Sequence, residues 1–164
     1  MKEYRITKYN PQNRVNGIYI VNEWTSISDV GKTFDAGVLL YTQYKKVEKA
    51  YTDCCVALIR CAGISKLSVC CPEYYDTDIR FPTDVSNEWD IRQIVMCCLQ
   101  EKCWVKLEAE NFFVHFGYDY YMYIGCTIPR SLVEELSQRY GLFCEVFPSP
   151  YNTQPKTEDD LGEP

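Results

Sequence analysis

The feature that most constrains the fold is a change of hydrophobic period at Cys103, after which apolar and polar side chains alternate. Within 103–109, Val105, Leu107 and Ala109 fall on one side of a strand. The alternation returns over 112–116 and 120–126, and turn-forming residues separate these stretches. Three short strands joined by tight turns predict an antiparallel meander.

The longest helical pattern lies over 42–62. Apolar side chains recur there at alternating spacings of three and four residues, at Tyr44, Val47, Tyr51, Cys54, Leu58 and Cys61. Shorter helices are predicted over 87–102 and 129–140, and the other main strands over 4–9, 66–71 and 142–147. Because strands cluster between helices, we predict an α+β fold. Its sheet is largely antiparallel, with three main helices mostly on one face and the tyrosines and charges of the meander on an exposed face.

The length of 164 residues suits one domain, which we place at 1–151. Residues 152–164 are rich in proline, threonine and acidic side chains, and we expect them to form an acidic disordered tail. The whole chain has 17 basic and 23 acidic residues, a formal net charge of −6. It therefore lacks the basic footprint of a nucleic-acid-binding protein. Its apolar runs are far shorter than the roughly 20 residues of a membrane-spanning helix, so we expect neither nucleic acid nor membrane as a partner.

Ten cysteines raise the question of disulfides or metal. The N-terminus shows no apolar signal-peptide core, so we expect the protein to stay in a reducing cytoplasm. Three cysteine pairs are sequence neighbours whose side chains point apart, at 54/55, 70/71 and 97/98. There is no C-x-x-C spacing and only one histidine. We therefore expect free thiols that pack as small apolar groups, with no metal and no cofactor.

His115 is the natural candidate for a general base. It sits within a predicted strand, and no nearby residues complete a nucleophile, base and acid, so we interpret it as a half-exposed strand residue and assign no catalytic residues. The alternative is a small thiol-dependent or hydrolytic enzyme that pairs His115 with a cysteine brought close by the fold.

The segment 73–90 combines six acidic side chains with four aromatic ones, against Arg80 alone. Aromatic rings can anchor a protein partner, and carboxylates speed its approach when that partner is basic. This pattern makes the segment a candidate docking surface. The alternative interpretation is an ordinary solvated loop followed by a helix N-terminus. The candidate partner-binding residues are Glu73, Tyr74, Tyr75, Asp76, Asp78, Asp84, Glu88 and Trp89.

Three stretches resemble immunity proteins of bacterial polymorphic or contact-dependent growth inhibition toxin systems. They are EYRITKYNP at 3–11, NEWTSISDVG at 22–31 and FGYDYYMYIG at 116–125. The resemblance implies a cytoplasmic, non-enzymatic protein that binds a cognate toxin domain and occludes its active site. Many such toxins are basic nucleases, for which an acidic inhibitor would compete with nucleic acid. A third hypothesis is a non-catalytic adaptor that self-associates through a tyrosine-rich sheet face; the oligomeric state is not determined by these patterns.

Overall fold

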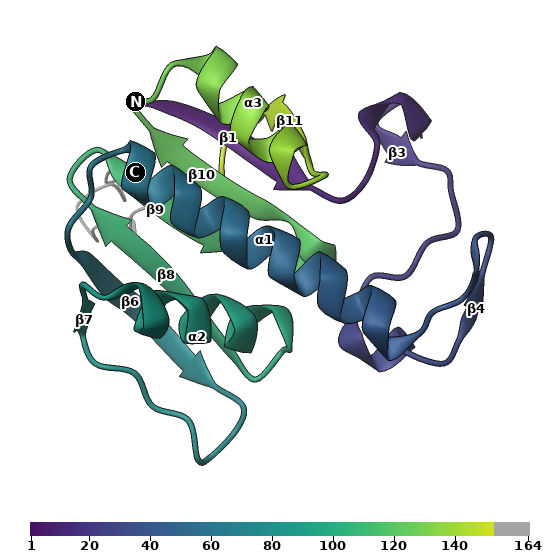
Figure 1. Ribbon diagram of the computed structural model, residues 1–164, viewed down its shortest axis with the longest axis horizontal. Helices are drawn as coiled ribbons and strands as arrows, with labels where there is room; N and C mark the ends of the chain where they lie inside the picture. Colours follow the sequence, from purple (N-terminus) through teal and green to yellow (C-terminus); the bar gives the residue numbers. More distant parts are fainter. Residues whose placement is uncertain (153–164) are drawn as a thin grey trace, which may run out of the picture.

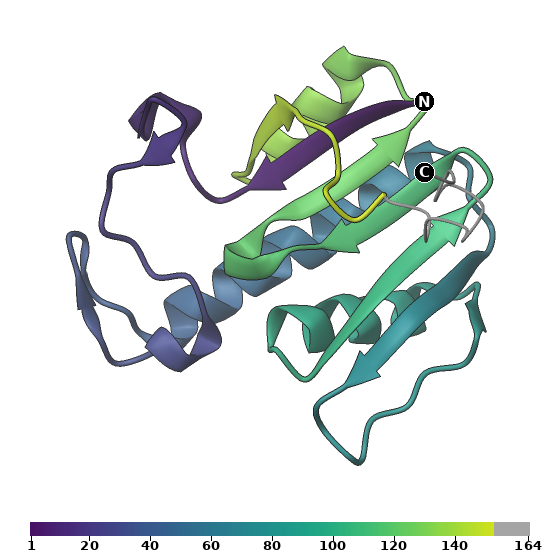
Figure 2. The same ribbon diagram turned by 180° about the vertical axis from the view of Figure 1, so that it is seen from behind.

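The computed structural model describes residues 1–152 and consists of one large sheet covered by three helices (Figure 1). All three helices lie against the same face of the sheet, and the view from behind shows the strands in front of them (Figure 2). The predicted α+β class is therefore confirmed. Of the predicted acidic tail, 152–164, all but Asn152 lies outside the described residues.

Seven strands form the main sheet in the order β11–β1–β10–β9–β8–β6–β7, and each neighbouring pair is antiparallel. The predicted meander is β8–β9–β10, in which Val114 of the central strand lies opposite both Leu107 and Ile124. The strands are β1 (Lys2–Thr7), β6 (Leu67–Tyr74), β7 (Asp84–Val85), β8 (Cys103–Ala109), β9 (Phe112–Phe116), β10 (Met122–Cys126) and β11 (Phe143–Val146).

Two strands have boundaries different from those predicted. β1 ends at Thr7 because the backbone N–H of Lys8 donates to the Tyr51 hydroxyl, 2.6 Å away, and so leaves the strand ladder. β6 continues past Pro72 to Tyr74 because the pairing register shifts between Cys70 and Glu73. Such a bulge accommodates a residue that has no N–H to donate.

The helices are α1 (Tyr41–Cys61), α2 (Glu88–Leu99) and α3 (Arg130–Arg139). Helix α1 buries most of its predicted stripe against the sheet, although Cys61 at its end is exposed. Helix α2 begins after Asn87, whose side chain accepts the Asp90 N–H at 2.8 Å. It ends earlier than predicted, because Glu101 adopts a left-handed conformation with φ of 58°.

Residues 8–40 leave the sheet and extend beyond one end of it (Figures 1 and 2). This excursion has no long element of its own. It contains two small hairpins, β2–β3 and β4–β5, and two 3₁₀ turns. The bounds are β2 (Arg14–Val15), β3 (Ile18–Tyr19), β4 (Thr33–Phe34), β5 (Gly37–Val38), and 3₁₀ turns at Pro11–Asn13 and Ile27–Asp29.

The sheet face opposite the helices is partly covered by the chain that follows β11 (Figure 2). The backbone N–H of Ser149 donates to Glu3 at 2.7 Å, and Lys106 donates to the Tyr151 carbonyl oxygen at 2.6 Å. Under this segment His115 and Tyr123 are buried. The expectation of an exposed, tyrosine-rich face is therefore wrong for this part of the sheet.

Candidate functional site

The eight predicted docking residues do not form one surface, because α2 separates them. Tyr75 and Asp76 lie beside the C-terminal end of the helix, where both backbone N–H groups donate to the Lys102 carbonyl oxygen, at 2.9 and 3.1 Å. Glu88 and Trp89 begin the same helix. A helix of this length spans about 18 Å, so the two groups are at opposite ends of it.

In the group at the start of α2, the carboxylates of Asp84 and Glu88 form ion pairs within the protein. Asp84 pairs with Lys66 at 3.1 Å and accepts a hydrogen bond from the Ser68 hydroxyl. Glu88 pairs with Arg92 at 2.9 Å and also with Arg60. These partners hold the pKa values of both carboxyl groups below their usual range. Trp89 is exposed, but the charge of Glu88 next to it is already compensated by Arg60 and Arg92.

The group that follows β6 keeps its carboxylates available. Glu73 accepts a hydrogen bond from the Tyr75 hydroxyl at 2.9 Å, and Asp76 accepts the Asp78 N–H at 3.0 Å, which folds the loop into a tight turn. Tyr74 is half-buried and packs beside Phe81. Within residues 1–152, Glu73, Asp76 and Asp78 form no ion pair.

Next to this loop lies a cavity of about 410 Å³, at the end of the sheet where β8 begins and β9 ends. Tyr75 contributes to its wall, so the predicted loop and the cavity form one site. No sequence pattern singles out the other lining residues, because they come from three separate segments. The aromatic lining is Tyr75, Trp104, Phe116, Tyr118 and Tyr120, and the acidic lining is Glu101 and Asp119.

One wall of the cavity is a strained turn that the core holds in place. Asp119 and Tyr120 are consecutive residues with φ of 59° and 62°. This conformation is unfavourable for residues other than glycine, and for an aromatic residue in particular. The Tyr51 hydroxyl donates to the Tyr120 carbonyl oxygen at 2.6 Å, and the Tyr120 hydroxyl donates to the Leu99 carbonyl oxygen at 3.2 Å. These bonds keep the Tyr120 ring at the cavity.

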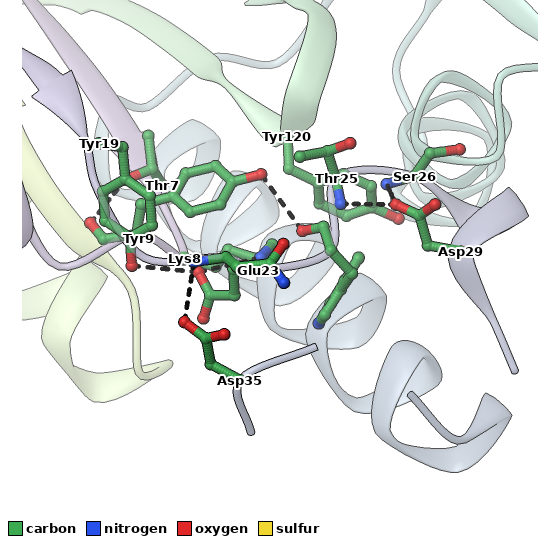
Figure 3. Close-up of polar contacts among 12 residues, drawn as sticks. Thr7, Lys8, Tyr9, Tyr19, Glu23, Thr25, Ser26, Asp29, Asp35 and Tyr120 are labelled. Carbon is green, nitrogen blue, oxygen red and sulfur yellow. Dashed lines mark hydrogen bonds and ion pairs between the residues drawn. The ribbon is translucent and has the colours of Figure 1, made fainter. Parts of the chain in front are cut away.

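The polar network behind this wall is shown in Figure 3. The Lys8 ammonium lies 4.1 Å from the Tyr9 ring centroid and 4.2 Å from that of Trp24, and it pairs with Glu23 at 3.3 Å. Burial lowers the pKa of Lys8 to about 8. Trp24 in turn packs edge-on against Tyr120, with 5.1 Å between the ring centroids. Lys8 thereby fixes part of the excursion 8–40 against the cavity wall.

The electrostatic character of the site is acidic. Five carboxylates lie in the loop or on the cavity lining, at Glu73, Asp76, Asp78, Glu101 and Asp119. Neighbouring basic side chains in these segments are Arg80 and Lys102, and Arg80 stacks on Tyr74 at 4.7 Å. Desolvation and the Glu73 carboxylate raise the pKa of Tyr75 to about 12, so its hydroxyl remains neutral at pH 7. The site therefore offers aromatic rings and uncompensated negative charge.

All ten cysteines are free thiols, but only four are buried as small apolar groups. Burial raises the pKa of Cys54 and Cys144 to about 12, which keeps both thiols protonated. Cys98 and Cys103 are at the cavity, with 3.8 Å between their sulfurs. Their mutual hydrogen bond lowers the pKa of Cys103 and raises that of Cys98.

The interpretation of His115 as half-exposed is wrong, since its side chain is completely buried. Its Nδ1 lies 2.9 Å from the Ser149 hydroxyl and its Nε2 lies 3.1 Å from the Glu108 carboxylate. These three residues have the composition of a hydrolase triad, and the neighbour of His115 is a serine instead of the cysteine considered above. Ser149 is only 6% exposed. The Tyr151 N–H also donates to the Ser149 hydroxyl oxygen at 3.2 Å, and we interpret the arrangement as one that holds the segment after β11 on the sheet.

No family model, curated protein or solved structure matches this chain. In the described part of the chain, no three or more histidine, cysteine, aspartate or glutamate side chains are grouped to hold a metal ion. No helix among residues 1–152 combines the length and the apolar character needed to cross a membrane. The properties of the site thus rest on its own geometry.

Proposed function

We propose that the protein is an immunity-type inhibitor that binds a basic toxin domain in the cytoplasm and occludes its active site. The observation that carries the proposal is the group of five carboxylates, without ion pairs in residues 1–152, around an aromatic cavity. Aromatic side chains at the centre and charge at the edge are typical of surfaces that bind a protein partner tightly and fast.

The docking surface comprises the loop 73–78 and the cavity lining. We name this set of residues the acidic-aromatic site. A nuclease toxin needs a basic cleft to hold phosphates, so an acidic inhibitor suits that class of partner. Asp84 and Glu88 contribute less to the attraction, because their charges are compensated by Lys66, Arg60 and Arg92.

The proposal is tested by co-expression with the product of the gene directly upstream, which the proposal predicts to contain a toxin domain. Cells that produce the toxin domain should survive when they also produce the wild-type protein, and the two proteins should purify as a complex. The variant Glu73→Gln/Asp76→Asn/Asp78→Asn should protect less well while keeping the wild-type melting temperature. If the wild-type protein gives neither protection nor a complex, the proposed function is wrong.

A further inference from the structure

The cavity of the acidic-aromatic site has the composition of a cage for an organic cation. Five aromatic residues line it, and the two carboxylates in its lining are Glu101 and Asp119. The lining contains no lysine, arginine or histidine. The face of an aromatic ring attracts cations, and the attraction grows when the cation loses water. A carboxylate at the edge of such a cage adds a charge-assisted hydrogen bond.

The protein itself shows the same recognition one layer deeper. The Lys8 ammonium lies over the rings of Tyr9 and Trp24. The Glu23 carboxylate lies beside it (Figure 3). The internal cage is filled by this chain's own ammonium group. The cavity likewise combines aromatic residues with carboxylates. Trp24 packs against Tyr120, which is part of the cavity wall.

The volume and the lining of the cavity suit an arginine side chain. Its volume of about 410 Å³ is ample for an arginine side chain, and the guanidinium plane can stack on a ring while its edge reaches a carboxylate. Tyr75 and Tyr118, 60% and 82% exposed, belong to the same lining and leave part of it open to solvent. An arginine that protrudes from a partner can therefore enter from outside.

The wall is also preorganised, which reduces the entropy lost on binding. The left-handed turn at Asp119 and Tyr120 is held by bonds to Tyr51 and to the Leu99 carbonyl oxygen. Strain that the surrounding structure maintains is typical of binding sites.

We propose that this cavity receives an arginine side chain of the protein partner, stacked between its aromatic rings and paired with Glu101 or Asp119. The inference rests on the proposed function for the identity of its partner, but the cage can be examined without any toxin. It places a guanidinium at the centre of the interface, where single side chains contribute most to affinity.

The test uses N-acetyl-arginine amide as a probe, with the isosteric but uncharged N-acetyl-citrulline amide as its control. Titrations followed by amide NMR should show saturable shifts at Gly117, Asp119 and Cys103. The citrulline compound should bind at least roughly tenfold more weakly than the arginine compound. This loss is expected because the desolvated cation–π contact and the charge-assisted hydrogen bond are both absent. Equal shifts with both probes, or shifts located elsewhere, would overturn the inference.

The variant Glu101→Gln/Asp119→Asn removes both lining charges and should reduce probe affinity roughly tenfold, the effect of losing a charged hydrogen-bond partner. Asparagine tolerates the left-handed conformation at 119, so the turn is retained. The control Glu134→Gln/Glu135→Gln changes net charge equally on α3 and should bind the probe normally. Probe binding without toxin neutralisation would support the cage and contradict the proposed function. Toxin neutralisation without probe binding would support the proposed function and contradict the cage.

Discussion

At the scale of single residues, tyrosine hydroxyls form hydrogen bonds that fix the relative positions of elements. Apolar contacts alone would not determine these positions. Tyr51 is completely buried, yet its hydroxyl accepts the Lys8 N–H and donates to the Tyr120 carbonyl oxygen, both at 2.6 Å. It therefore links α1 to the end of β1 and to the cavity wall. The sequence places Tyr51 on the apolar stripe of a helix, but helical spacing carries no information about which backbone groups meet its hydroxyl.

Replacing Tyr51 with phenylalanine tests this role. The Tyr51→Phe variant leaves a buried N–H and a buried carbonyl without their partner, so we expect the free energy of unfolding to fall by about 1–3 kcal/mol. Tyr118→Phe is the matched control, because Tyr118 is exposed and should change stability little. Urea denaturation measures both. Equal stability of Tyr51→Phe and the wild type would contradict the assigned role.

His115 provides a pH-dependent prediction at the same scale. Burial lowers its pKa below the ordinary 6.5, although Glu108 acts in the opposite direction. Between the lowered pKa and 6.5 the unfolded chain binds more protons than the folded one, so stability rises with pH across this window. Acidification from pH 7.5 to 5.5 should therefore destabilise the wild type. The His115→Gln variant should lose this dependence in urea denaturation curves, and an unchanged slope would show that another group causes it.

At the scale of elements, the sequence predicts the parts of the fold that follow one hydrophobic period. Alternation from Cys103 identifies the meander, and spacings of three and four residues identify α1. The extent of β6 could not be predicted in this way. Pro72 predicts the end of the strand, but the bulge between Cys70 and Glu73 lets the pairing continue. The cavity could not be predicted either, because its walls depend on Tyr75 meeting Lys102 and on a strained turn after β9.

A close approach within the meander gives a prediction for β9 and β10. Gly125 pairs with Phe113, and a Cβ atom at 125 would lie 2.1 Å from the Phe113 ring. The ring cannot move freely, because it stacks on His115 with 4.1 Å between centroids. Gly125→Ala should lower the free energy of unfolding by about 1–3 kcal/mol, the range for overpacking a filled core.

The control for this prediction is to make Gly125→Ala in the Phe113→Ala background and to ask whether the two losses of stability add. In the Phe113→Ala background the added methyl group has room, so Gly125→Ala should then cost little further stability. Thermal or urea denaturation of the four proteins forms a complete double-mutant cycle. Additive losses would mean that the methyl group added at position 125 clashes with something other than the Phe113 ring.

At the scale of the whole molecule, the carboxylates fall into two classes, those that form ion pairs within the protein and those that do not. Some, such as Asp84 and Glu88, are compensated by internal ion pairs and stabilise the fold. Others, in the loop 73–78 and around the cavity, have no such partner in residues 1–152. The charge run 73–90 indicated an acidic surface, but only the fold separates the available carboxylates from the compensated ones.

The most direct test of the central claim is the association rate constant with the toxin domain, measured by stopped flow between 25 and 300 mM salt. For the wild type we expect a steep fall with salt, because attraction between exposed charges is screened. Glu73→Gln/Asp76→Asn/Asp78→Asn should associate more slowly at low salt and show a shallower dependence. Glu110→Gln/Glu134→Gln/Glu135→Gln, with the same net charge change elsewhere, should behave like the wild type. Identical salt dependence in all three proteins would contradict electrostatic docking at the acidic-aromatic site.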